Sequence, residues 1–311
     1  MKTTHLPTVK QLRYFVALEE IGHFGKAAEA CHVSQSAFSV GIKELESLLG
    51  EQLVDRTNRS VTITPLGKEV AVQARLVLRD LENLVELVQT GNEPLSGKLR
   101  LGVIPTIAPF LLPRIMPALR KAFPKLQLYL REDMTARLHE QLMAGELDLI
   151  LIALPYELRN VELLPLFHDP FLLACRRGTK LVDPKHYAFN RLTAESVLLL
   201  EDGHCLRDHA LSACRIRSLE KVSRFAASSL LTLIEMVDED LGITFLPAMA
   251  EGSPMLKGTR LCLHPLSEKS FREIGLAWRR GSGRVDEFKL LGEFIQQQQD
   301  KIFREVGSRR C

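Results

Sequence analysis

Three helix-start and helix-stop signals follow one another within the first 50 residues, and their order constrains how the chain begins to fold. Thr8 and Gln11 have the spacing of a capping box, Ser34 can cap a later helix, and Gly50 can end that helix. Apolar residues recur at helical spacing between the signals, and two short apolar runs follow. The sequence therefore predicts helices over residues 8–22, 25–31 and 34–50 and short strands over 53–56 and 61–64.

The start of the third predicted helix presents short polar side chains on the face opposite its apolar stripe. Phe38, Ile42, Leu45 and Leu49 are expected to face inward. The outward-facing residues are Gln35, Ser36, Ser39 and Lys43. Such side chains suit base edges and phosphates, and Arg59 at the predicted hairpin tip suits a phosphate or the minor groove. The spacing fits a winged DNA-reading head and also an ordinary three-helix core with a solvated hairpin.

A long helix is predicted after the hairpin. Thr64 and Pro65 are a cap followed by proline at the first helical position, and the helical pattern continues to residue 89. Its apolar residues alternate spacings of four and three, at Val70, Ala74, Val77, Leu81, Leu84 and Val88. This short heptad seam predicts a helix about 37 Å long that pairs with a second copy and so carries two heads to two half-sites. A helix packed on its own domain is the alternative.

The remainder of the chain alternates strand and helix patterns. Residues 91–97 resemble a linker, and apolar strand patterns follow at 98–105, 126–131, 147–154, 171–175, 197–200, 243–246 and 274–278. We expect a mostly parallel sheet covered on both faces, and Thr106 and Thr135 follow its first two strands. Ligands bind beyond the carboxyl ends of such strands, although each threonine can also be a simple helix cap.

Composition limits the classes of protein. The net charge of +3 does not by itself indicate nucleic acid, since residues 1–65 carry seven basic and seven acidic side chains. No apolar run approaches the roughly 18 residues needed to cross a bilayer, so no membrane segment is expected and the predicted location is the cytoplasm. Six scattered cysteines are too few for a secreted disulfide framework and are expected to be thiols in a reducing compartment.

The segment 201–214 concentrates reactive side chains. Cys205 and Cys214 lie nine residues apart beside His204, Arg207 and His209. A thiol at a helix start near cations can react with peroxide, and a second thiol can capture the sulfenic acid that forms. In a helix the two would be about 13 Å apart, too far for a disulfide, so joining them requires the helix to unwind. Buried structural cysteines and a metal site formed by His204, Cys205, His209 and Cys214 remain open.

The head resembles a known family. FGKAAEACHVSQSAFSVGIK at 24–43 and LVDRTNRSVTITPLG at 53–67 are similar to LysR-type transcriptional regulators. The resemblance implies an α/β fold with an N-terminal winged helix-turn-helix, a linker helix and a two-lobed α/β effector domain like that of periplasmic binding proteins. The expected boundaries are 1–65 for the head, 66–90 for the linker helix, 98–167 with 281–305 for the first lobe, and 168–280 for the second.

A narrower resemblance concerns the cysteine segment. LLLEDGHCLRDHALSAC at 198–214 and GVIPTIAPFLLPRI at 102–115 are similar to the OxyR group of hydrogen-peroxide sensors within the LysR family. That likeness implies that Cys205 reacts with peroxide and that Cys214 resolves it into a disulfide. The residues implied to hold or orient the peroxide are Thr106, Thr135, His204, Arg207, Asp208 and Arg279. The remaining cysteines are expected to be core thiols, apart from the terminal Cys311.

The leading hypothesis is thus a peroxide-responsive regulator of oxidative-stress genes rather than an enzyme. Its expected partners are double-stranded promoter DNA, RNA polymerase and further copies of itself, as a homodimer or homotetramer, with no metal and no cofactor. One rival is a LysR-type regulator that binds a small anionic metabolite between the lobes. A thiol peroxidase is the other, and it is disfavoured because it does not account for a DNA-reading head.

Overall fold

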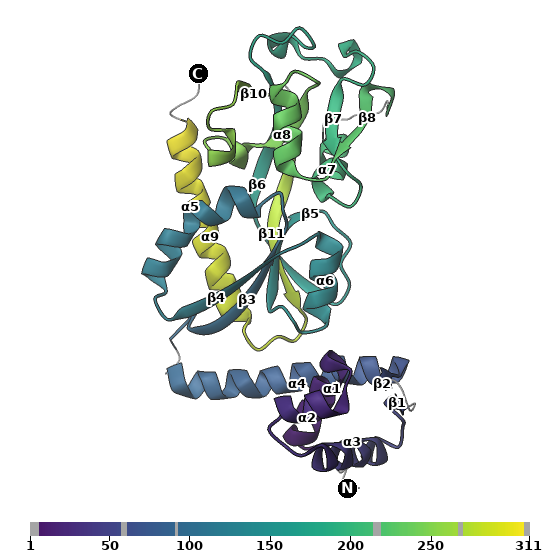
Figure 1. The fold of residues 1–311 in the computed structure, drawn as a ribbon. Coiled ribbons are helices and arrows are strands. Elements are labelled where there is room, and N and C mark those ends of the chain that lie inside the picture. Colours follow the sequence, from purple (N-terminus) through teal and green to yellow (C-terminus); the bar gives the residue numbers. More distant parts are fainter. Residues whose placement is uncertain (1–5, 57–60, 91–92, 214–218, 267–269, 308–311) are drawn as a thin grey trace. The chain divides into compact units, whose positions relative to one another are not determined.

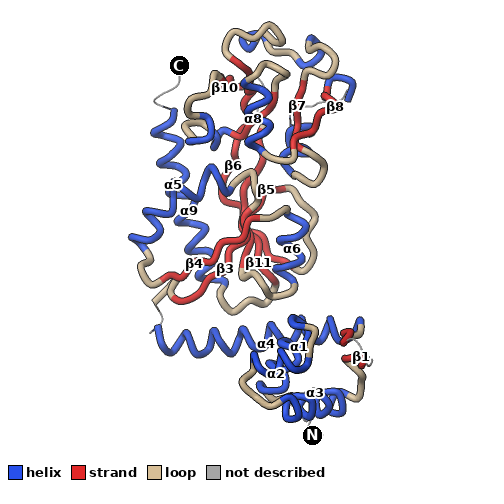
Figure 2. Tube along the Cα trace, viewed as in Figure 1, coloured by secondary structure: helices blue, strands red, loops and turns tan. Residues whose placement is uncertain are grey.

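The structure, a computed structural model, describes residues 6–56, 61–90, 93–213, 219–266 and 270–307. Two compact units make up the chain (Figures 1 and 2). The first unit comprises Met1–Glu93 with Met143–Glu146, and the second comprises Pro94–Leu142 with Leu147–Cys311. Arg59 and Cys214, both named from the sequence, lie outside the described residues.

Three helices begin the first unit, as the sequence predicts: α1 (Val9–Ile21), α2 (Phe24–Ala30) and α3 (Gln35–Leu49). The capping box at Thr8 is present in both directions, and the Ser34 side chain accepts the hydrogen bond that caps α3. Gly50 ends α3 in the left-handed conformation (φ 75°), which glycine adopts without strain. Local cap chemistry therefore fixes the helix boundaries.

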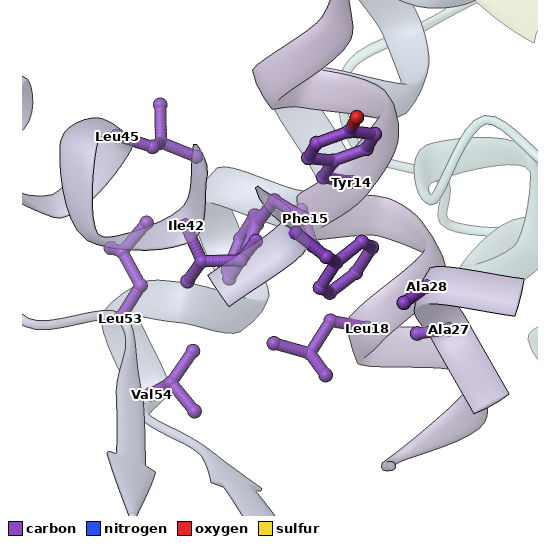
Figure 3. Close-up of a cluster of buried hydrophobic side chains, with 11 residues drawn as sticks. Tyr14, Phe15, Leu18, Ala27, Ala28, Ile42, Leu45, Leu53 and Val54 are labelled. Carbon is purple, nitrogen blue, oxygen red and sulfur yellow. The ribbon is translucent and has the colours of Figure 1, made fainter. Parts of the chain in front are cut away.

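One apolar core joins these helices to the strands that follow (Figure 3). Its buried members include Tyr14, Phe15, Leu18, Ala27, Ala28, Phe38, Ile42, Leu45, Leu53 and Val54. Leu49, predicted to face inward, is 41% exposed because it lies one turn beyond Leu45, where this core ends. The hairpin strands β1 (Val54–Arg56) and β2 (Val61–Ile63) are held to α3 by the Glu46 carboxylate, which accepts bonds of 3.0 Å from the Leu53 and Val54 amides.

The long helix α4 (Pro65–Thr90) starts where the sequence predicts. The Thr64 hydroxyl accepts the Gly67 amide at 2.9 Å. A Cβ on Gly67 would clash with the Leu53 carbonyl oxygen, so only glycine lets α4 begin this close to the hairpin. Arg75 on α4 pairs with Glu19 of α1 in a mostly buried ion pair, which fastens the long helix to the three-helix core.

The second unit contains two lobes. The first lobe alternates strands and helices: β3 (Gly97–Val103), α5 (Ala108–Ala122), β4 (Leu126–Glu132), α6 (Thr135–Met143) and β5 (Leu149–Leu154). The second lobe contains β7 (Val197–Leu200), α7 (Cys205–Ala213), β8 (Val222–Ala227), α8 (Leu230–Asp238), β9 (Thr244–Pro247) and β10 (Leu261–Pro265). Short 3-10 helices lie at Pro184–His186, Phe189–Arg191, Leu219–Lys221, Ala248–Ala250 and Pro254–Leu256.

Two long strands, β6 (Val161–Arg176) and β11 (Phe271–Arg279), connect the lobes (Figure 1). The main sheet has the order β10-β6-β11-β5-β3-β4, with β9 also paired to β6. Pairings among β4, β3 and β5 and between β7 and β8 are parallel, but every pairing of β6 and β11 is antiparallel. The prediction of a mostly parallel sheet is therefore wrong for the connecting strands, which run back and forth between the lobes.

The C-terminal helix α9 (Val285–Gly307) packs on the first lobe against α5, β6 and β11, as predicted. Phe294 of α9 meets Phe123, which follows α5, edge to face at 5.5 Å between ring centroids. Among the described residues, no helix combines the length and the apolar character needed to span a membrane.

Candidate functional site

Cys205 is the first residue of helix α7 in the second lobe. Gly203, just before it, has a φ of 97°, a conformation that L side chains rarely adopt, and this turn brings the chain from β7 into the helix. The thiol side chain is buried, with 7% exposure. Residues 205–213 are helical, so a helix starting at Cys205, which the sequence predicts, is present.

Two polar side chains beside Cys205 lack partners. Thr135, the first residue of α6, lies against the thiol and lowers its pKa, but the pair does not reach ordinary hydrogen-bond geometry. Its hydroxyl has no other partner among the described residues, and neither does Nε2 of His204; both side chains are buried. Buried polar groups normally have partners, so the unpartnered Thr135 hydroxyl beside the thiol marks a place where a small polar molecule would gain a hydrogen bond.

Arg272 on β11 supplies the cation of the site. Its Nη1 donates to the Thr106 hydroxyl and its Nη2 to the Thr106 carbonyl oxygen, both at 2.9 Å. Its Nη2 also lies 3.0 Å from Oδ2 of Asp169 on β6, and both side chains of this pair are fully buried. Because Thr106 follows β3, the Arg272 network joins the first lobe to both connecting strands.

Opposing effects act on the Cys205 thiol. Burial raises its pKa most strongly, and Asp208 adds to the rise; the Arg272 charge, the nearby Thr135 hydroxyl and a backbone hydrogen bond lower it. The net direction is upward, so the helix start and the neighbouring cations that the sequence suggested do not bring the pKa of this thiol below its ordinary value. Desolvation of the sulfur outweighs the nearby positive charge.

Arg207 and His209 hold helix α7 in place. Arg207 donates to the Leu200 carbonyl oxygen at 3.2 Å and pairs with the exposed Asp202 at 2.9 Å, so its guanidinium already has partners other than the thiol. Nε2 of His209 lies 3.1 Å from the Pro155 carbonyl oxygen in the first lobe. Burial lowers the pKa of His209, and the Arg272 charge contributes in the same direction, so the ring is neutral at physiological pH. Asp208 is exposed.

The family resemblance implied a role for Arg279, whereas the arginine whose charge acts on Cys205 is Arg272. Arg279 lies seven residues further along the same strand, which is about 23 Å at 3.3 Å per residue, and pairs with Val161 at the far end of the first lobe. The signal for Arg272 was weak, because an arginine in a strand pattern is normally exposed. Its partner Asp169 is also a charged residue within a strand, and two opposite charges in strand segments were the one sequence signal that could have indicated a buried ion pair.

The metal alternative has no support within the part of the chain that the structure describes. No group of three or more His, Cys, Asp and Glu side chains there is arranged to hold a metal ion. Cys214, the fourth member of the set considered from the sequence, lies outside that part.

The outward face of α3 is a second candidate surface. Gln35, Ser36 and Lys43 are exposed and Ser39 is half-buried. Val40, which was not among the residues predicted from the sequence, is 53% exposed between them and offers an apolar contact of the kind that a thymine methyl group takes.

The free face of α4 is apolar. Of the predicted seam, Ala74 is buried within the unit, whereas Val77, Leu84 and Val88 are 47%, 58% and 78% exposed. A groove of about 760 Å³ lies between the start of α1 and the first half of α4, lined mostly by apolar side chains such as Leu12, Leu66 and Val70. Apolar residues exposed in register along a helix are typical of a face that another molecule covers.

Two family models match this chain. The model described as a bacterial regulatory helix-turn-helix protein of the lysR family matches residues 9–68. The model described as the LysR substrate binding domain matches residues 92–300. Together they span both units of the structure.

Individual relatives are similar over nearly the whole chain. The DNA-binding transcriptional dual regulator OxyR of Escherichia coli K12 is 40% identical, covering 96% of this chain and 98% of the relative. The HTH-type transcriptional regulator EstR of Acinetobacter baylyi is also 40% identical, covering 94% and 97%. A solved full-length OxyR variant from Pseudomonas aeruginosa is 36% identical with a TM-score of 0.77, covering 94% of this chain and 95% of that one.

Proposed function

The chain belongs to the LysR family of bacterial regulators, and on that basis we propose that it senses hydrogen peroxide through a reversible Cys205–Cys214 disulfide and thereby controls oxidative-stress genes. Members of this family are transcriptional regulators, and relatives named OxyR or hydrogen peroxide-inducible genes activator support the peroxide-sensing role. The disulfide and the residues that serve it are our inference.

The observation that carries the proposal is a buried thiol with the unpartnered Thr135 hydroxyl beside it. Hydrogen peroxide is small, and its two hydroxyl groups both donate and accept. The Thr135 hydroxyl would hold it next to the Cys205 sulfur, and we propose that Nε2 of His204, which is also buried and unpartnered, supplies a second hydrogen bond. The Arg272 charge favours the thiolate and stabilises the negative charge that develops on the departing oxygen.

The chemistry has two steps. The Cys205 thiolate attacks one oxygen of peroxide, so an S–O bond forms and the O–O bond breaks; the departing hydroxide takes up a proton and leaves as water. The Cys214 thiol then attacks the sulfenic sulfur, so the disulfide forms, the S–O bond breaks and a second water leaves. Overall, two thiols lose two electrons and one peroxide becomes two water molecules.

Formation of the disulfide would change the conformation of helix α7. Helix α7 runs from Cys205 to Ala213, so the Cα atoms of these two residues are about 12 Å apart along its axis. Cys214 is bonded to Ala213, with Cα atoms about 3.8 Å apart, so its Cα would lie at least about 8 Å from that of Cys205, whereas a disulfide needs Cα atoms within about 7 Å. Forming the bond therefore requires α7 to unwind. Unwinding would break the hydrogen bond from Arg207 to the Leu200 carbonyl oxygen and the one between His209 and the Pro155 carbonyl oxygen of the first lobe.

The first unit would bind the promoter DNA. We propose that Gln35, Ser36, Ser39 and Lys43 on α3 contact promoter DNA, and that Arg59 contributes from the hairpin tip. A second copy would cover the exposed apolar face of α4, giving a dimer that reads two half-sites, and pairs of dimers would form the tetramer. Such a regulator acts in the cytoplasm, where its contacts with DNA and RNA polymerase change when α7 unwinds.

A metabolite-binding regulator is the second candidate, because the EstR relative is as similar as the OxyR relative and its name indicates no peroxide. The charges of the site argue against an anionic ligand. Arg272, the buried cation, already pairs with Asp169, so a ligand that keeps a full negative charge would compete with that carboxylate, whereas the peroxide reaction places negative charge there only transiently.

Mass spectrometry of the peroxide-treated protein tests the proposal. Trypsin releases Cys205 in peptide 192–207 and Cys214 in peptide 208–215, so one stoichiometric peroxide dose to the reduced full chain should join these two peptides. Peroxide consumption without added reductant should stop after about one equivalent. Rapid continuous turnover with reductant would indicate a peroxidase instead.

Two variants control the result. Cys205→Ser should abolish both the linked peptide and peroxide consumption. Cys31→Ser removes a half-buried thiol of the first unit and should leave both unchanged. If the reduced protein did not react with peroxide at all, the metabolite-binding alternative would stand.

A further inference from the structure

A second cysteine pair lies in the second lobe, apart from the segment that carries Cys205. Cys175 is near the end of β6 and Cys262 is in β10, and the two are directly opposed across the antiparallel pairing of these strands. Directly opposed residues in such a ladder point to the same face of the sheet. The sequence alone suggested two unrelated core thiols, since 86 residues separate them.

The ladder geometry suits a disulfide. The Arg177 amide donates to the Arg260 carbonyl oxygen at 2.8 Å, and the cysteines lie two positions along from that pair on each strand. They therefore occupy a hydrogen-bonded position, where Cα atoms are about 5.5 Å apart, within the 4.4–6.8 Å that disulfides span. Opposed Cβ atoms are about 4.5–5.5 Å apart, slightly more than in a relaxed disulfide, so the bond would be strained and easily reduced.

Access favours one thiol as the first to react. Among the described strands, β10 is the last at one end of the main sheet, and Cys262 on it is partly exposed. Cys175, on the neighbouring strand, is 1% exposed. An external reagent thus reaches Cys262 first, and Cys175 lies buried opposite it on the neighbouring strand, where it can attack the Cys262 sulfur.

Cys175 differs from Cys205 in its surroundings. Burial raises the pKa of Cys175 to about 11, and the neighbouring Cys262 and Asp240 add to the rise. None of these influences on Cys175 is a cation, whereas the Arg272 charge acts on Cys205.

We propose that Cys175 and Cys262 form a second, reversible thiol–disulfide couple that responds to small disulfides such as glutathione disulfide and operates independently of Cys205. The Cys262 thiolate attacks glutathione disulfide, forms a mixed disulfide and releases one glutathione. Cys175 loses its proton, attacks the Cys262 sulfur and releases the second glutathione. Two thiols are oxidised and one glutathione disulfide is reduced. The new bond ties the edge strand β10 to β6, which connects the lobes.

Peptide mapping in a glutathione redox buffer tests this couple on the reduced full chain. Trypsin places Cys175 in peptide 160–176 and Cys262 in peptide 261–269, both distinct from the peptides of Cys205 and Cys214. Raising the ratio of oxidised to reduced glutathione should convert these two peptides into one linked species, and added reduced glutathione should reverse it. If both cysteines stayed separately alkylatable throughout, the proposal would be wrong.

Variants separate this couple from the peroxide site. In Cys205→Ser, the disulfide that joins peptides 160–176 and 261–269 should form as readily as in the unaltered chain. If this disulfide formed only when Cys205 was present, the couple would not be independent of Cys205. Cys175→Ala should stop at glutathione on Cys262, and Cys262→Ser should leave Cys175 unmodified. If the unaltered chain also stopped at glutathione on Cys262, Cys175 would have no resolving role.

The rate of ring closure gives a further check. With the pKa of Cys175 near 11, closure of the mixed disulfide should accelerate roughly tenfold per pH unit between pH 7 and 9. The flanking groups that act on Cys175 are Cys262 and Asp240. A rate of closure that did not change with pH would contradict the assignment of Cys175 as the buried attacking thiol.

Discussion

Replacing Arg272 by methionine should strongly destabilise the second unit. The side chain of Arg272 is fully buried, pairs with Asp169 and makes two hydrogen bonds to Thr106. Methionine is of similar length and fills the space without charge. The substitution leaves the Asp169 carboxylate buried without its counter-charge, and breaking a buried pair in this way costs about 3–5 kcal/mol.

Urea unfolding of the full chain, followed by tryptophan fluorescence, measures this cost. The single tryptophan, Trp278, is buried on β11, the strand that also carries Arg272, and therefore reports on the second unit. At a slope of roughly 2–3 kcal/mol per molar urea, the midpoint should fall by about 1–2.5 M. The double variant Asp169→Asn with Arg272→Met should recover part of the loss, because no charge is then left buried alone.

Arg260→Met is the matched control. Arg260 also pairs with carboxylates, Asp238 and Glu239, but its side chain is 48% exposed, so its loss should cost less than about 1 kcal/mol. If Arg272→Met were no more destabilising than Arg260→Met, the buried network would not hold the lobes together as we argue.

Three further outcomes are expected. Because burial raises the pKa of Cys205, its second-order rate constant with peroxide should rise roughly tenfold per pH unit between pH 6 and 8, and a flat stopped-flow profile would contradict this. Thr135→Val removes an unpartnered buried hydroxyl, so stability should hold within about 1 kcal/mol while the same rate constant falls about tenfold; an unchanged rate would exclude Thr135 from the site. Leu84→Glu, at an exposed position of the α4 seam, should reduce the sedimenting mass with no loss of helical circular dichroism, and an unaltered mass would place the dimer contact elsewhere.

Local signals predicted the first unit well. Caps at Thr8, Ser34 and Thr64 and the stop at Gly50 act within a few residues, so each helix boundary can be derived from nearby sequence. The same holds for the start of α7 at Cys205, which follows a glycine turn.

The first half of β6 was not predicted, and its sequence explains why. Pro165 and Pro170 interrupt the strand pattern, and proline in a central strand normally argues against one. The structure accommodates Pro165 at a bulge, where the pairing with β11 skips a residue opposite Ile274 and Gly275. A bulge depends on the partner strand, about 110 residues away, and so leaves no local signal.

Local sequence marked some residues of the candidate site and not others. Cys205 begins a helix and the two threonines follow strands, so these positions stood out, whereas the roles of His204 and the threonines toward peroxide came from the family resemblance and stay proposals. Arg272 and Asp169 were missed because each can be buried only when paired with the other, and the two are 103 residues apart in the sequence. The raised pKa of Cys205 could not be predicted for a related reason. Burial within the folded protein raises the pKa more than the positive charges near Cys205 in the sequence lower it.

DNase footprinting tests the central claim most directly. Promoter fragments captured by the reduced protein from sheared genomic DNA would be footprinted with the unaltered chain and with Cys205→Ser, each before and after one equivalent of hydrogen peroxide. We expect the protected region of the unaltered chain to change length or position after peroxide and to revert with reductant, whereas the Cys205→Ser footprint stays constant. A peroxide-dependent footprint change in Cys205→Ser would contradict the account.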